Sequence, residues 1–236
     1  TDSASAPPRN MAEFVDWAQA NPGRMTHPDV SNFMGATFLK QALVEFAPDP
    51  SALQQPVSDA AYQTATAPLW AWYEALRPNL WRQGRVFPEN QSVQDRLVND
   101  GALDMSMSFD PASTAAAIAE GLLPEGMRVF TPEGGTLGNV SFVAIPFNAA
   151  NREGAMVVAN FLLDPATQAH MQNIEVLGSF SVLDPARLDA EARAAFDALP
   201  SAPALPRLED LGPTLLEPHP SWMTRLTEDW ATRILR

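Results

Sequence analysis

The chain has 236 residues, of which 46% are hydrophobic and 18% are charged, a composition typical of a folded protein rather than a disordered one. Its net charge of −13 argues against duplex nucleic acid or an anionic lipid surface as a partner. The absence of cysteine excludes disulfides, thiol nucleophiles and thiolate metal sites. No apolar run approaches the length of a membrane-spanning helix, so no membrane insertion is predicted.

The first third of the chain is predicted to form helices separated by short extended segments. Asn10 has the side chain of a helix N-cap, and Asn21-Pro22-Gly23 is a typical helix stop. Ser31 and Asn32 supply capping side chains for a second helix, which carries an apolar stripe. The elements predicted here are a strand over 24–28 and helices over 11–20, 33–46 and 60–76.

The middle of the chain adds further short strands. Residues 102–109 alternate apolar with polar side chains, which is the two-residue period of a strand with two distinct faces. Asp110-Pro111 has the pattern of a helix N-cap followed by proline. The elements predicted here are strands over 85–88, 102–109, 127–131 and 140–146, with helices over 92–99 and 110–120.

The last third is predicted to be mainly helical. Its helices cover 151–163, 167–172 and 184–199, and a Pro-rich linker over 200–220 leads to a final helix capped by Ser221. Strands and helices alternate over residues 1–146, and this order is typical of an α/β fold. We therefore expect a mainly parallel sheet flanked by helices.

Open α/β sheets bind ligands where strands end and helices begin, and three such junctions are visible. They contain Ser31, Asn32 and Phe33, then Phe109 and Asp110, and finally the Gly-rich loop over 134–139. Each offers free backbone N–H groups, short polar side chains or an aromatic edge. A purely structural role is equally open, because Ser31, Asn32 and Asp110 can cap helices and the glycines can form a turn.

Known catalytic and metal motifs are missing from the sequence. His27, His170 and His219 are scattered without a His or Glu partner at helical spacing, so no metal site is predicted. No phosphate-binding Gly motif, other cofactor motif or Gly-x-Ser-x-Gly elbow is present, and no cofactor is expected. Trp81 lies in a predicted turn beside Arg82, which makes it a candidate stacking surface, although tryptophans more often pack in a core.

Several segments spread over the chain are distinctive as a combination. They read PGRMTHP at 22–28, NFMGATFLKQAL at 32–43, LWRQG at 80–84, MSFDP at 107–111, VAIPFNA at 143–149, DPATQA at 164–169 and HPSW at 219–222. Together they resemble the extracytoplasmic solute-binding proteins of ABC importers, in particular the YnjB-like group with the type II periplasmic binding fold. The sequence departs from that group at Asp110, where an aromatic residue is more often followed by asparagine.

This resemblance implies two lobes that close on a small solute and present it to ABC permease subunits in the membrane. Residues 1–140 would form an essentially whole second lobe, 141–204 the return crossover with a partial first lobe, and 205–236 a Pro-rich linker and C-terminal helix packed on a lobe. Family members are longer at the N-terminus, so the rest of the first lobe and a signal peptide are expected upstream. The resemblance also implies a periplasmic monomer.

The ligand contacts that the resemblance and the junctions favour are Ser31, Asn32, Phe33, Trp81, Phe109, Asp110, Thr136, Gly138 and Asn139. Binding without catalysis is expected. Two alternatives remain open: an α/β hydrolase or lyase that uses Asp110 and His27, and a solute sensor without a transport role. The solute is also open, because the acidic chain favours a cation whereas a helix N-terminus at Ser31 favours an anion.

Overall fold

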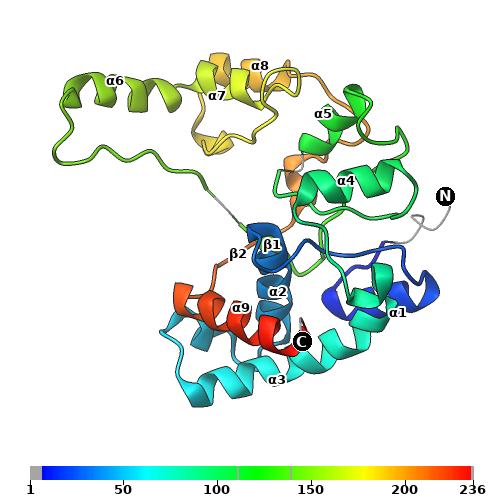
Figure 1. Cartoon of the computed structure of the whole chain (residues 1–236). Coiled ribbons are helices and arrows are strands. Elements are labelled where there is room, and N and C mark those ends of the chain that lie inside the picture. Colours follow the sequence, from blue (N-terminus) through cyan, green and yellow to red (C-terminus); the bar gives the residue numbers. More distant parts are fainter. Residues whose placement is uncertain (1–6, 111, 139, 235–236) are drawn as a thin grey trace.

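The computed structural model describes residues 7–110, 112–138 and 140–234, which form a helix-rich fold (Figure 1). The α-helices are α1 (Met11–Ala20), α2 (Phe33–Phe46), α3 (Asp59–Leu76), α4 (Gln91–Asn99), α5 (Ser113–Ala119), α6 (Arg152–Leu162), α7 (Pro165–Gln172), α8 (Ala190–Asp197) and α9 (Pro220–Ile234). Short 3₁₀ helices are η2 (Pro50–Gln54), η3 (Arg77–Asn79), η4 (Trp81–Gly84), η5 (Pro185–Arg187) and η6 (Leu208–Leu211). The strands are β1 (Thr136–Leu137) and β2 (Thr214–Leu215).

Side-chain caps explain why most helices begin where the sequence predicts. The Asn10 side chain accepts a hydrogen bond from the Glu13 N–H at 2.9 Å, and Asn32 accepts one from the Met34 N–H at 2.9 Å. The predicted bounds of α2 are confirmed, and those of α3 are confirmed to within one residue. The helix predicted over 184–199 is divided instead, because Asp189 caps α8 and leaves η5 as a separate turn.

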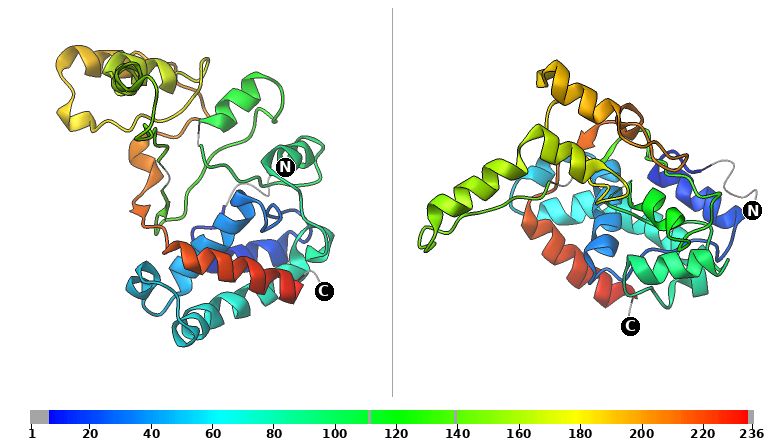
Figure 2. Two further views of the ribbon diagram at one scale, coloured as in Figure 1. Left: turned by 60° about the vertical axis from the view of Figure 1, so that its left-hand side comes forward. Right: turned by 90° about the horizontal axis from the view of Figure 1, so that it is seen from above.

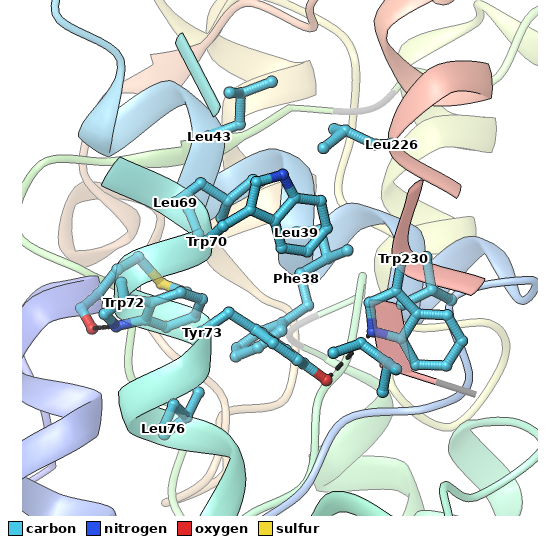
Figure 3. Packing of buried hydrophobic residues seen from close by; sticks show 14 of the residues in the cluster. Phe38, Leu39, Leu43, Leu69, Trp70, Trp72, Tyr73, Leu76, Leu226 and Trp230 are labelled. Carbon is cyan, nitrogen blue, oxygen red and sulfur yellow. Dashed lines mark hydrogen bonds between the residues drawn. The ribbon is translucent and has the colours of Figure 1, made fainter. Parts of the chain in front are cut away.

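The main core lies between α1, α2, α3 and α9 (Figure 3). Aromatic residues fill much of it, and their polar atoms find backbone or side-chain partners. The Trp72 Nε1–H donates to the Met11 carbonyl at 2.6 Å, and the Trp230 Nε1–H donates to the Tyr73 hydroxyl oxygen at 3.2 Å. Trp222 and Leu226 complete the buried face of α9. The C-terminal helix is therefore part of the same core as the first 80 residues.

The mainly parallel sheet expected from the sequence is not formed in the described residues. The segments expected as strands, at 24–28, 85–88, 102–109, 127–131 and 140–146, are not assigned as strands there. β1 pairs with β2 in parallel, although both had been expected to lie in loop or linker. Isolated backbone hydrogen bonds do form at three of the expected segments. The Asp104 N–H donates to the Arg24 carbonyl, which links 102–109 to 24–28, and the Asp29 N–H, just after 24–28, donates to the Pro88 carbonyl at the end of 85–88. Pro28 and Pro88 cannot donate such bonds, which interrupts any ladder there.

Helices α6, α7 and α8 form a separate layer from the α1–α2–α3–α9 core, as Figure 1 and the left view of Figure 2 show. α7 contacts both α6 and α8. Neither α6 nor α8 buries a residue. None of the helices in the described part of the chain is long and apolar enough to cross a bilayer.

Candidate ligand-binding site

Two of the predicted strand–helix junctions meet at the beginning of α2. The rings of Phe33 and Phe109 stack with their centroids 4.7 Å apart and their planes inclined by 23°. Phe33 is the first residue of α2 and remains 53% exposed, whereas Phe109 is half-buried. A solvent-facing aromatic pair of this kind offers a flat surface on which a ligand ring or an apolar group can stack.

Polar groups surround the start of α2, and their local roles are structural. Asn32 is the N-cap, as the capping interpretation predicts. The exposed Ser31 donates both its N–H and its Oγ–H to the Asp29 carboxylate, at 2.8 and 2.7 Å. The turn over 29–32 therefore holds Phe33 in place through its own side chains.

Asp110 follows the aromatic pair in the chain and lies half-buried in a turn. Its Oδ1 accepts a hydrogen bond from the Ala112 N–H at 3.0 Å, and partial burial raises its pKa above the ordinary value. α5 begins at Ser113 rather than at 110, with Ala112 at the N-cap position and no side-chain cap, so Asp110 caps the turn that precedes the helix. Its carboxylate is therefore engaged by the backbone of its own turn, directly after Phe109 in the chain.

The third junction is fixed to α2 by a buried glutamine. The Gln41 side chain donates to the Gly135 carbonyl and accepts from the Leu137 N–H, both at 3.0 Å. Thr136 is in β1 beside these groups, and the Gly138 N–H donates to the Leu215 carbonyl at 3.3 Å. Asn139 lies outside the described residues.

Lys40 is a further residue near the aromatic pair that the sequence interpretation missed. Its Nζ lies 5.3 Å from the centre of the Phe33 ring and donates to both oxygens of Glu217, at 2.7 and 2.6 Å. Its side chain is only 4% exposed. The signal in the sequence was the polar pair Lys40-Gln41 between Leu39 and Ala42 in a strongly apolar helix. Such a pair predicts buried polar partners.

Trp81 lies in a different part of the fold from the Phe33–Phe109 pair. It packs on a small cluster that contains Leu103 and Leu123, and the Arg82 guanidinium lies 4.4 Å from the centre of its ring. Its backbone N–H donates to the Met25 carbonyl. These contacts favour the packing interpretation of Trp81 over a role in the candidate site.

His27 is completely buried and has partners on both ring nitrogens, the Pro28 carbonyl at 2.7 Å and the Tyr73 hydroxyl at 2.8 Å. Burial lowers its pKa to about 4, so the ring is neutral near pH 7. Within the described residues, no group of three or more His, Asp or Glu side chains is arranged to hold a metal ion.

Comparisons with known proteins place this chain in a family. Residues 1–204 match the family model for bacterial extracellular solute-binding proteins. Protein YnjB of Escherichia coli K12 is 39% identical over 233 residues, which are 98% of this chain and 58% of YnjB. The chain thus spans less than two thirds of that relative, and no solved structure shows a significant match to it. The chain belongs to the bacterial extracellular solute-binding protein family.

Proposed function

We propose that this protein is the substrate-binding component of an ABC importer, which binds a small solute in the periplasm and delivers it to membrane permease subunits. Membership of the solute-binding family supports this role. The observation that carries the proposal is the partly exposed Phe33–Phe109 stack at the beginning of α2. Aromatic side chains together with a few polar groups are the lining that small-molecule sites use.

In the proposed site, Phe33 and Phe109 cover an apolar part of the solute, and Asp110 orients a polar group. Ser31, Asn32 and the β1 loop with Thr136, Gly138 and Asn139 complete the contacts. No bond is made or broken, so recognition depends on shape, stacking and hydrogen bonds. Gln41 supports this arrangement, because it fixes the β1 loop to the helix that carries Phe33.

We also infer a type II arrangement of lobes, in which residues 1–140 and 141–204 belong to different lobes and 205–236 return to the second lobe. Two observations support it. α9 packs in the core of the first 80 residues, whereas residues 140–163 expose a set of large apolar side chains that includes Phe142, Phe147 and Phe161. Such a surface is typical of an interface rather than of a finished domain. YnjB is long enough to supply more of a first lobe.

The enzymatic alternative, with Asp110 and His27 as catalytic groups, finds little support. His27 is enclosed between the rings of Phe38 and Phe87, at centroid distances of 4.9 and 4.8 Å. A substrate would have to displace the core to reach it. A solute sensor without a transport role would bind its solute on the same Phe33–Phe109 surface. What distinguishes a sensor from an importer component is whether the protein delivers the solute to a permease.

Thermal shift against a panel of aromatic and aliphatic organic cations, amino acids and small oxyanions tests the proposal. A solute at 100 times its Kd should stabilise the protein by about 2.7 kcal/mol. The Phe33→Ala/Phe109→Ala variant should lose that gain, while Phe130→Ala, at an exposed aromatic elsewhere, should keep it. A solute that stabilises the double variant as strongly as the wild type would contradict the site, and turnover of any panel member would contradict binding without catalysis.

A further inference from the structure

The corner formed by η3 and η4 has an unusual backbone. Arg82 and Gln83 have φ angles of 50° and 60°, and Gly84 follows with 58°. Left-handed conformations cost roughly 1–2 kcal/mol for residues other than glycine. Hydrogen bonds hold the corner in place: the Gln83 N–H donates to the Leu80 carbonyl at 2.8 Å, and the Arg77 Nε–H donates to the Gly84 carbonyl at 3.0 Å. With this backbone conformation, Arg82 and Gln83 are both exposed to solvent.

Two open grooves flank this corner and share Pro78, Gln83 and Arg85. The first, of about 440 Å³, is lined by Trp70, Tyr73, Glu74, Arg77, Pro78, Gln83, Arg85, Arg233 and Ile234. The second, of about 620 Å³, is lined by Pro22, Gly23, Pro78, Leu80, Arg82, Gln83, Arg85 and Val86. Because they share these lining residues, the two grooves adjoin, and we call them together the arginine groove.

The arginine groove is basic in a protein whose net charge is −13. Within the described residues, neither Arg82 nor Arg85 has a carboxylate partner, and Arg85 donates only to the side-chain oxygen of Gln83. The Arg77 guanidinium donates hydrogen bonds to the carbonyls of Gly84 and Ile234. Among the residues that the structure describes, Glu74 is the one acidic residue that lines either groove.

The arginine groove is separate from the candidate solute site. The Gly23 N–H donates to the Asn79 carbonyl at 2.8 Å, which ties the corner to the beginning of segment 24–28. Phe33 follows the other end of that segment and stacks on Phe109 there. Two distinct surfaces therefore lie at opposite ends of the segment.

We propose that the arginine groove is a docking surface for an acidic segment of a partner protein. Arg233 in the first groove is already paired with Asp229 at 3.0 Å, so Arg82 and Arg85 are the cations available to a partner. Both line the second groove, and Arg85 continues into the first, which suits an extended chain with several carboxylates better than a single small anion. Arginine is also enriched at protein interfaces, and Val86, which lines the second groove, is 45% exposed. A guanidinium pairs with a carboxylate through two parallel hydrogen bonds, and its neighbours supply apolar contact.

Fluorescence anisotropy of labelled hexaglutamate, with labelled hexaserine as a control peptide, tests this proposal on the chain itself. We expect saturable binding of hexaglutamate alone, against the overall repulsion of an acidic protein. The Arg82→Gln/Arg85→Gln variant should weaken binding about tenfold. The matched variant Arg152→Gln/Arg187→Gln removes the same charge from two other exposed arginines and should bind as the wild type does.

Equal weakening by the two variants would overturn the proposal, because it would indicate general charge rather than a site. Absence of saturable hexaglutamate binding at millimolar peptide would also overturn it. Complete competition by inorganic phosphate at the same concentration as the peptide would replace the acidic segment with a small oxyanion. Circular dichroism of both variants controls for folding, and exposed positions 82 and 85 are expected to leave the melting temperature unchanged.

Discussion

Buried His27 is hydrogen-bonded through its two ring nitrogens to Pro28 and to Tyr73 of α3, and Tyr73 continues the chain of hydrogen bonds to α9. A carbonyl can only accept, so Nδ1–H donates to Pro28, and Nε2 accepts from the Tyr73 hydroxyl. The Tyr73 oxygen in turn accepts from Trp230 of α9. The histidine that the sequence offers as a possible catalytic group is therefore a structural residue. Its neutral form is required by these hydrogen bonds and by its burial.

Stability should depend on the protonation of His27. Burial lowers its pKa from 6.5 to about 4, so the unfolded chain binds the proton first as pH falls. The stabilisation is fully present above pH 6.5 and is lost as pH falls toward 4, by about 3 kcal/mol in total. Urea denaturation between pH 7 and 4.5 should show this loss, and His27→Gln should lack the component between pH 7 and 5. An unchanged slope in that variant would refute the assignment.

Gly35 marks the closest approach of α2 to the turn that precedes it. A Cβ at this position would lie 2.1 Å from the Pro28 oxygen and 2.4 Å from the Asp29 oxygen, both backbone atoms. Gly35→Ala should therefore destabilise the protein by about 3 kcal/mol, measured by urea denaturation. Gly126→Ala adds the same methyl group where nothing lies within 4 Å, and should change stability by much less. Equal effects would mean that α2 does not pack on this turn.

At the scale of elements, α2 organises the molecule. It carries Phe33 at its start, holds β1 through Gln41, and binds the segment before α9 through the Lys40–Glu217 ion pair. Lys40 is buried whereas the Glu217 side chain is 43% exposed, so the two partners depend on the pair unequally. A buried ammonium without its carboxylate is costly.

A double-mutant cycle tests that inequality. Glu217→Gln should destabilise the protein by about 2 kcal/mol, because it leaves the buried Lys40 charge without its carboxylate. Adding Lys40→Met removes that charge and should recover most of the loss. Denaturation midpoints of the wild type, both single variants and the double variant give the coupling free energy. Additive effects would show that the ion pair does not contribute.

Helices could be predicted from the sequence because their signals are local. Asn10, Asn32 and Asp164 are each close in sequence to the N–H groups that they cap. The residues that determine where α1, α2 and α7 begin are therefore neighbours along the chain. A strand instead needs a partner from elsewhere. Residues 102–109 have a clear alternating pattern, but a single backbone bond from Asp104 to Arg24 does not make a ladder.

The residues of the candidate site show the same difference between local signals and long-range contacts. Asn32, Phe33 and Phe109 could be selected because they stand at predicted strand–helix junctions. The stacking of Phe33 on Phe109 and the reach of Lys40 to Glu217 could not, because each joins residues far apart in the chain. Trp81 was a weaker aromatic candidate from the sequence, and its packing on Leu103 shows that it lies in a different environment.

On the scale of the whole molecule, core and exposed apolar surface are unevenly distributed. The main cluster draws on residues 11–80 and on α9, whereas the region over 140–163 leaves Phe142 88% and Phe147 98% exposed. Side chains that contact nothing contribute little to stability but promote association. This contrast underlies the proposal that residues 141–204 belong to a different lobe from residues 1–140.

Replacing those two phenylalanines should change association without changing stability. Phe142→Ser/Phe147→Ser should leave the urea midpoint of this chain within about 0.5 kcal/mol of the wild type. It should also reduce self-association in sedimentation velocity and the binding of a hydrophobic dye. Phe130→Ser, at a less exposed phenylalanine outside this region, is the control. A large loss of stability in the double variant would show that the surface is already covered within the chain.

The central claim is that the Phe33–Phe109 surface holds a small solute. Native mass spectrometry of the protein isolated from its own bacterium tests it most directly. We predict a non-covalent small-molecule adduct on the wild type that is lost from Phe33→Ala/Phe109→Ala and retained by Phe130→Ala. An adduct that persists in the double variant, or a wild-type protein that carries none and gains none from a cell extract of small molecules, would contradict the account.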